Sequence, residues 1–307
     1  MKSQNIKNSI WLAIILSITI ASSSLPCSMC LCGDRLYLYG HGNQLQPGKF
    51  SISFENRYFS KTSGGTEAGS EAFEKQSEYR PAAILAYGIK ENFTLTASVC
   101  GSFKRLEETE LSDTEVENVS GLGDFQIEGV WNNKISERFS SSYVLGVFLA
   151  VKAPTGSNSK MENNVRLDEH AQPGTGSWDL NGGLGITRIT ESRSGYITGF
   201  YRINGTNEYD YHFGNMISFN FGGDYRPKPS YALTLAMNGR YASRDKEDVE
   251  ELQNTGGWVL YLTPGFRYDF QSSFGIITNL QVPVFKDLNE DQSEKAVFNL
   301  TFRYDII

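Results

Sequence analysis

The pattern that most restricts this chain is strict alternation of apolar and polar residues, which recurs in segments between Lys49 and Ile307. In the clearest segment, an apolar residue or glycine stands at every second position from Phe93 to Phe103, with Thr, Ser and Cys between them. Alternation places the two sets on opposite faces of a β-strand, and about 9–11 residues cross a bilayer when the strand is tilted. The pattern therefore predicts membrane-crossing strands.

Twelve segments carry this pattern, strongly or weakly: 50–58, 79–89, 93–103, 122–131, 142–153, 178–188, 196–203, 216–226, 231–241, 258–270, 276–285 and 296–306. The connections alternate between short ones (90–92, 132–138, 190–194, 227–230, 271–273) and longer ones (60–77, 106–120, 154–176, 204–214, 243–255, 286–293). Outer-membrane barrels have short periplasmic turns and longer outer loops. We therefore expect an all-β, transmembrane antiparallel barrel of about 12 strands with both termini in the periplasm.

The first segment has the features of a secretory signal peptide. Lys2 and Lys7 precede an apolar run from Ile10 to Ile20, which is too short to span a membrane, and small residues follow it. We expect three parts: a signal peptide at 1–24, a Cys-rich periplasmic segment at 25–47 and the barrel at 48–307. The predicted location is the outer membrane of a Gram-negative bacterium.

Composition excludes two other classes of protein. A net charge of −7 without a basic patch argues against nucleic acid as a partner, and a mean hydropathy of −0.35 argues against a helical membrane protein. The 13% aromatic residues fall mainly near strand ends, as the interface girdles of a barrel require. A secreted β-sandwich or propeller is the alternative, which Pro81, Pro264 and Pro283 mildly favour; in a barrel we expect these prolines at bulges or near strand ends.

Three short motifs resemble a known family. They are Gly121-Leu-Gly-Asp-Phe125, Leu149-Ala-Val-Lys-Ala-Pro-Thr-Gly156 and Pro173-Gly-Thr-Gly-Ser-Trp-Asp179. In this order they resemble the MetA-pathway phenol-degradation family of outer-membrane proteins. The resemblance implies a β-barrel transporter associated with the uptake of aromatic or hydrophobic compounds, and it brings no catalytic residues.

The same motifs also have a purely physical interpretation. Glycines such as Gly121 and Gly123 lie inside strands, where we expect them to allow barrel curvature. The second and third motifs bracket the loop at 154–176, which is long enough either to fold inward as a constriction or to stand up as a lid.

Charged residues on the inward faces are the candidates for a solute path. A barrel of this size can hold either a narrow channel or a plugged lumen, and many of these charges are expected to pair across strands and fill it. The candidates are Glu55, Arg57, Lys104, Glu128, Lys152, Asp179, Arg240 and Arg267.

A thiol cluster follows the signal peptide. Cys27, Cys30 and Cys32 are soft ligands suited to Cu, Zn or an iron–sulfur centre. In the oxidising periplasm a disulfide is the alternative. Cys100 is predicted to face the lumen, so a bridge to it would draw the N-terminal segment into the barrel as a partial plug.

An enzyme is not expected. None of the three histidines, His41, His170 and His212, lies on a predicted strand beside a serine, so nothing holds a nucleophile–base pair. We predict a channel for small solutes, hydrophobic or aromatic compounds among them; the alternative is a plugged barrel with a metal-binding or redox thiol segment. The predicted partners are membrane lipid, small solutes and, through the last strand, the barrel-insertion machinery.

Overall fold

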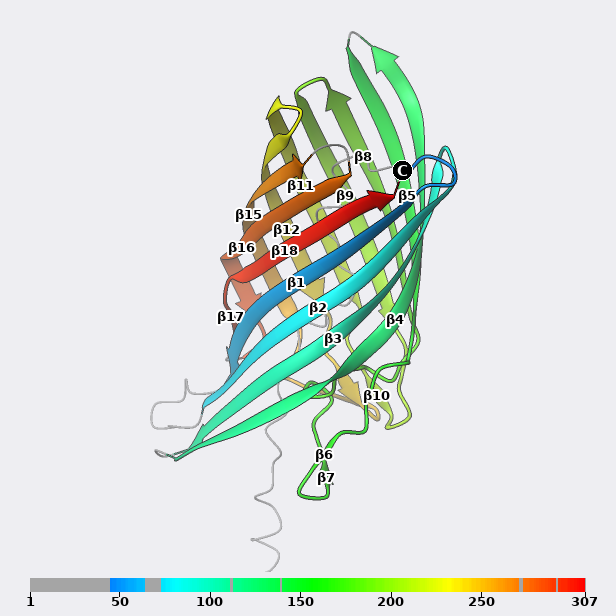
Figure 1. Ribbon diagram of the computed structural model, residues 1–307. Coiled ribbons are helices and arrows are strands. Elements are labelled where there is room, and N and C mark those ends of the chain that lie inside the picture. Colours follow the sequence, from blue (N-terminus) through cyan, green and yellow to red (C-terminus); the bar gives the residue numbers. More distant parts are fainter. Residues whose placement is uncertain are drawn as a thin grey trace, which may run out of the picture.

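The chain folds into a closed β-barrel (Figure 1). The computed structural model describes residues 45–63, 73–110, 113–138, 140–270, 273–290 and 292–306. Their long strands are β1 (Phe50–Ser63), β2 (Phe73–Lys90), β3 (Phe93–Glu110), β4 (Asp113–Arg138), β5 (Ser141–Ala153), β8 (Asp179–Thr190), β9 (Arg193–Asn204), β11 (Met216–Lys228), β12 (Tyr231–Ala242), β15 (Gly257–Phe270), β16 (Phe274–Leu288) and β18 (Val297–Ile306). Each pairs antiparallel with the next, and β1 pairs with both β2 and β18. The predicted twelve-strand antiparallel barrel is therefore confirmed.

Alternation decides which side chains face the bilayer. In β12, Leu233, Leu235 and Met237 are exposed on the outer wall, whereas Ala232, Ala236 and the polar residues Asn238 and Arg240 are buried. Every long strand carries such exposed apolar side chains, and buried polar side chains line the opposite, inner face. This arrangement is the reverse of a soluble protein and suits a barrel that crosses a bilayer. The described part of the chain contains no helix that is long and apolar enough to cross a membrane.

The first and last strands meet at one end of the barrel, because Phe50 of β1 pairs with Ile306 of β18. The tight turns after β2, β4, β8, β11 and β15 lie at this same end, since the strands alternate in direction. We call it the turn end. The long connections lie at the opposite, loop end, where β6, β7 and β10 are seen below the barrel (Figure 1).

One predicted loop, 106–120, is largely strand instead, and the described parts of another, 60–63 and 73–77, are strand as well. The segment 106–120 forms a hairpin in which β3 and β4 stay paired up to Glu110 and Asp113, and β1 and β2 stay paired up to Ser63 and Glu74. The loop prediction for 106–120 was wrong because strand alternation continues there: Leu106 and Val119 point inward and are buried. In Figure 1 this hairpin projects beyond the neighbouring strands.

The predicted turn at 132–138 is likewise the end of β4. It pairs with the start of β5, with a β-bulge between Lys134 and Ser136.

The prolines show how strand pairing accommodates a missing N–H. Pro283 lies beside the register shift between β15 and β16, as expected for a bulge. Pro264 lies in mid-strand, where β15 has no partner in β16 between Leu262 and Gly265. Pro81 lies in a similar gap between β2 and β3, with Tyr79 and Ala82 as the flanking pairs. The expected strand-end position was therefore wrong for Pro81 and Pro264, but each sits where one ladder is interrupted.

The connections at the loop end carry small elements of their own. They are β6 (Met161–Glu162), β7 (Val165–Arg166), β10 (Tyr211–His212), β13 (Lys246–Glu247), β14 (Glu250–Glu251) and β17 (Ser293–Glu294). The connection between β5 and β8, residues 154–178, is called loop 3 below. Its outgoing part forms the β6–β7 hairpin, and its returning part, residues 169–175, is buried. Ala171 packs there against Leu106 and Val119 on the inner face of β3 and β4.

Candidate functional site

A buried carboxylate fixes loop 3 to the inner wall. Asp124 of β4 accepts hydrogen bonds from the Lys152 ammonium (2.6 Å), the Gly156 amide (2.9 Å), and the Thr175 amide (3.0 Å) and hydroxyl (2.8 Å). Lys152 also forms an ion pair with Asp179 at 2.9 Å and contacts the Thr175 hydroxyl. The side chains of Asp124 and Lys152 are only 0% and 5% exposed. A charge this deeply buried must be paired and hydrogen-bonded, and here the partners come from both ends of loop 3.

Glycines allow the loop to approach the wall backbone to backbone. A Cβ atom on Gly156 would stand 2.7 Å from the Gly123 carbonyl carbon and 2.8 Å from the Gly174 Cα atom. A Cβ atom on Gly121 would stand 2.8 Å from the Pro173 ring. The curvature prediction for Gly121 and Gly123 was therefore incomplete, because these two strand glycines make room for loop 3.

The three sequence motifs thus meet at one place. The first supplies Gly121, Gly123 and Asp124, the second Lys152 and Gly156, and the third the segment Pro173–Asp179. We call this contact region the motif cluster. The motif cluster explains why loop 3 folds inward. Of the two predicted arrangements, a constriction and a lid, the structure has the inward one, because the returning part of loop 3 lies against the inner wall.

Lys104 provides a second anchor on the same wall. Its ammonium group donates to the carbonyl oxygens of His170 (2.6 Å) and Gln172 (2.7 Å). Lys104 points into the lumen from β3 and supplies hydrogen bonds to two buried carbonyl groups of loop 3 that water no longer solvates.

The other side of loop 3 is held by the neighbouring loops. The Tyr211 hydroxyl lies 2.7 Å from His170 Nε2 and donates to Asp245 Oδ2 at 2.9 Å, and His170 Nε2 lies 3.2 Å from the same carboxylate oxygen. Asp245 also accepts the Gly214 amide at 2.7 Å, and its own amide donates to Thr255. This group, which we call the loop latch, joins loop 3 to the connections after β9 and β12. Since β12 lies far around the barrel from β3 and β4, loop 3 extends across the loop-end mouth of the lumen.

The remaining charged candidates also lie on the inner face, where several form ion pairs. Arg57 lies 3.1 Å from Glu55 and donates to the Asn299 side chain at 2.8 Å. Arg240 forms an ion pair with Glu294 of β17 at 2.5 Å. Glu128 is buried, whereas Arg267 is half-buried near the turn end and pairs with Asp269 at 2.8 Å. Their contact with a solute stays a prediction.

Neutral side chains form a hydrogen-bonded belt on the opposite half of the inner wall. Asn220 donates to Thr198 (3.0 Å), Asn238 donates to Asn220 (2.9 Å), and the Thr263 hydroxyl donates to Asn238 (2.5 Å). Further along, Asn299 donates to Asn279 at 2.8 Å. This half of the inner wall therefore carries amide and hydroxyl side chains beside charged ones such as Asp224 and Arg240.

Sequence reasoning missed several residues of this site. Tyr211 and Asp245 lie in connections that were predicted only as outer loops, and no local pattern marks them. Thr175 belongs to the third motif, but the motif does not show that Thr175 bonds to Asp124. Glu294 lies between the last predicted loop and the last predicted strand. Asp124 belongs to the first motif, and the presence of two further motifs in the same chain is the signal that could have pointed to it.

The thiol cluster cannot be placed. Cys27, Cys30 and Cys32 lie outside the described residues, as do the predicted signal peptide and His41, so these predictions remain untested. Within the described ranges, no group of three or more His, Cys, Asp or Glu side chains could hold a metal ion. Cys100 is buried in β3, where its sulfur would lie 2.6 Å from a Cβ atom on Gly123.

A closed barrel with an apolar outer wall, a polar inner wall and an inward loop defines an outer-membrane β-barrel. The particular family is shown by a sequence comparison: the model described as "Putative MetA-pathway of phenol degradation" matches residues 101–284, and the chain belongs to this family. The match includes all three motifs. No curated protein matches the chain.

One solved structure supports the fold, and two others are given for comparison. An outer-membrane channel from Pseudomonas putida F1 superposes with a TM-score of 0.67 at 14% identity, covering 86% of this chain and 98% of that one. The KdgM porin gives 0.40 at 9% identity, covering 84% and 99%. The CymD monoaromatic hydrocarbon channel gives 0.43 at 8% identity, covering 86% and 90%. None of these comparisons supports the alternative of a thiol-rich plug.

Proposed function

We propose that this chain is an outer-membrane channel that passes small solutes, with hydrophobic or aromatic compounds among them, and that loop 3 controls its loop-end mouth. The observation that carries the proposal is the motif cluster: the residues that match the family converge on an anchor that holds a loop inside the barrel. A barrel with only a structural role would not need four hydrogen bonds to one buried carboxylate to keep a loop in its lumen.

The proposal includes the orientation of the barrel. The turn end, with both described ends of the chain, faces the periplasm, and the loop end faces the outside, as in barrels with short periplasmic turns. We further propose that the last strand, β18, is the part that the barrel-insertion machinery recognises, and that the exported chain has lost residues 1–24.

We propose no catalytic activity. His170 is fully buried and its Nε2 atom faces Tyr211 and Asp245, so a substrate cannot reach the ring. His212 lies in the short strand β10, in a connection rather than on the barrel wall.

Planar-bilayer conductance tests the proposal. We expect the purified barrel to conduct, and a variant with residues 157–172 replaced by a short Gly-Ser linker to conduct more, because the linker cannot cross the mouth. A second variant without residues 25–47 separates loop 3 from the thiol segment. If only this second variant opens, the control belongs to the N-terminal segment; if no variant conducts while each remains a folded barrel, the channel proposal is wrong.

A further inference from the structure

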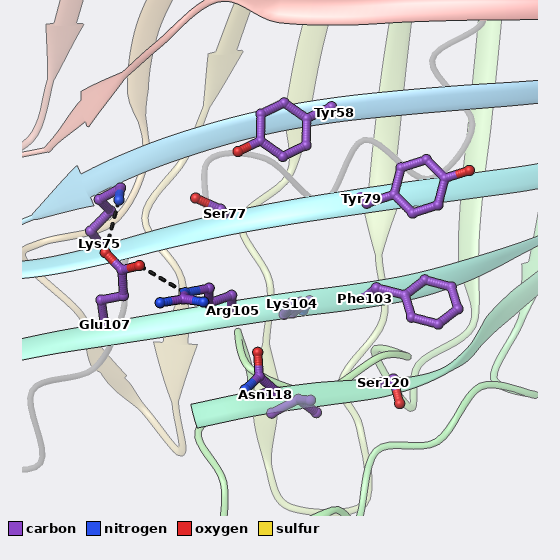
Figure 2. A pocket seen from close by; sticks show the side chains of 11 residues that line it. Tyr58, Lys75, Ser77, Tyr79, Phe103, Lys104, Arg105, Glu107, Asn118 and Ser120 are labelled. Carbon is purple, nitrogen blue, oxygen red and sulfur yellow. Dashed lines mark hydrogen bonds and ion pairs between the residues drawn. The ribbon is translucent and has the colours of Figure 1, made fainter. Parts of the chain in front are cut away.

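A groove of about 550 Å³ opens on the outer wall, where β1–β4 approach the loop end (Figure 2). Its lining includes three aromatic side chains, Tyr58, Tyr79 and Phe103, and three charged ones, Lys75, Arg105 and Glu107. We call it the outer groove. Phe103 and Arg105 point away from the lumen, since Lys104 between them reaches inward to loop 3. The outer groove is therefore accessible from the membrane and not from the solute path.

The three rings form its apolar part. All three are exposed, and the Tyr79 and Phe103 rings lie 6.0 Å apart. The Tyr79 hydroxyl donates to Asn56 at 2.6 Å, which fixes the orientation of this ring. Exposed aromatic rings at this position mark the interface between hydrocarbon and headgroups.

The three charged groups lie beyond the aromatic rings, closer to the loop end and further from the hydrocarbon of the bilayer. In β3, the stretch from Phe93 to Phe103 already supplies the roughly 9–11 residues that a tilted strand needs to cross a bilayer. Arg105 and Glu107 follow it directly, and Lys75 pairs with Glu107 across the hairpin. Their level along the strand is thus that of lipid headgroups rather than acyl chains.

One carboxylate holds the two cations together. Glu107 accepts hydrogen bonds from Lys75 Nζ and Arg105 Nε, both at 2.8 Å, and these bonds lower the pKa of Glu107. The Lys75 and Arg105 side chains remain 35% and 56% exposed. Each cation gives Glu107 one N–H, so two ammonium donors and four guanidinium donors remain, with a net charge of one positive. A fixed pair of cations with spare donors is suited to a phosphate group, which guanidinium binds through two parallel hydrogen bonds.

We propose that the outer groove binds the phosphorylated sugar headgroup of an outer-leaflet glycolipid. The phosphate lies against Lys75 and Arg105, the sugar lies on the rings of Tyr79 and Phe103, and the acyl chains continue along the apolar wall. The inference rests on the orientation proposed above, because only the outer leaflet of this membrane is rich in such lipids. Binding at this level would fix the height of the β3–β4 hairpin beside the mouth of the barrel.

Lipid binding to the purified full-length barrel in detergent tests the inference, with native mass spectrometry counting bound lipids. The probes are bis-phosphorylated lipid A, the same lipid after removal of its phosphates, and phosphatidylglycerol. The test variant is K75Q/R105Q; the control, K90Q/R193Q, removes two exposed cations at the turn end. Heat-modified migration in gels verifies that each variant is a folded barrel.

We expect one tightly bound lipid A per wild-type barrel. Affinity falls about thirtyfold in K75Q/R105Q, since each cation near an anionic headgroup contributes roughly a factor of five, and stays within about twofold in the control. Equal binding by folded K75Q/R105Q overturns the inference, as does equal binding of dephosphorylated lipid A or of phosphatidylglycerol. The number of bound lipids can be measured whether or not the barrel conducts, so this test is independent of the channel proposal.

Discussion

Replacing Asp124 should release loop 3 from the wall. Asp124→Ala removes the acceptor of four hydrogen bonds and leaves the buried Lys152 ammonium with Asp179 as its remaining ion-pair partner. Breaking a buried ion pair from one side costs about 3–5 kcal/mol. Because Asp179 still compensates Lys152, we expect the lower limit, about 3 kcal/mol, for the attachment of loop 3. That corresponds to a roughly 150-fold larger population of released loop, at about 1.4 kcal/mol per factor of ten.

Limited trypsin digestion and single-channel recording measure this release. Lys160 and Arg166 in loop 3 are the cleavage sites, and in the intact loop Arg166 is held by an ion pair with Glu169 and lies 3.5 Å from the centre of the Tyr209 ring. We expect faster cleavage at these sites and a larger open probability in D124A. Asp269→Asn is the matched control, because it removes a paired carboxylate at the turn end, away from loop 3. Unchanged cleavage and conductance in a folded D124A barrel would refute the anchoring role of Asp124.

Four further predictions concern the same end of the barrel. Tyr211→Phe keeps the ring but removes the hydroxyl that bridges His170 and Asp245; loop 3 should lose about 1–2 kcal/mol of attachment and its cleavage rate should lie between wild type and D124A. Gly156→Ala should expose loop 3 to trypsin because the new methyl group meets backbone at 2.7 Å, whereas Gly199→Ala, with nothing within 4 Å, should not; equal protection of both would contradict the close packing. Outside the membrane-spanning part of β4, burial and the neighbouring Glu162 raise the pKa of Glu117 to about 7, so the contact between β4 and the β6–β7 hairpin should be strongest at low pH and weaken as pH rises through 7. Hydrogen exchange at 161–166 measures this, and Glu162→Gln should weaken the pH dependence, since burial still raises the pKa of Glu117. An epitope inserted beside Val249, which is 89% exposed, should bind antibody on intact cells; binding only after lysis would reverse the proposed orientation.

The barrel itself could be predicted because its physical cause is local. Whether Leu233 or Ala232 faces lipid depends only on its place in an alternating strand. In a closed barrel the same alternation applies to every strand. The hairpin of β3 and β4 was missed since its end is acidic and solvated, so alternation there carries little apolar contrast.

The site could be predicted only in part. Lys104, Lys152 and Asp179 were expected on the inner wall from their strand positions, but their contacts with loop 3 depend on segments far apart in sequence. His170 and Asp245 are separated by 75 positions and come together only through the fold of two loops. The strand glycines predicted curvature only, because the sequence does not show what packs against them: the partner of Gly121 is Pro173, 52 residues away.

The pairing of β1 with β18 has a consequence for biogenesis. The barrel closes only when β18 pairs with β1, through the register from Phe50–Ile306 to Tyr58–Phe298. Loss of residues 297–306 would leave β1 and β16 as two long unpaired edges in a hydrocarbon solvent, where each unsatisfied backbone group costs several kcal/mol. We therefore expect no stable, partly closed form within the bilayer. A truncation that removes only β18 should lead to degradation of the protein by periplasmic proteases.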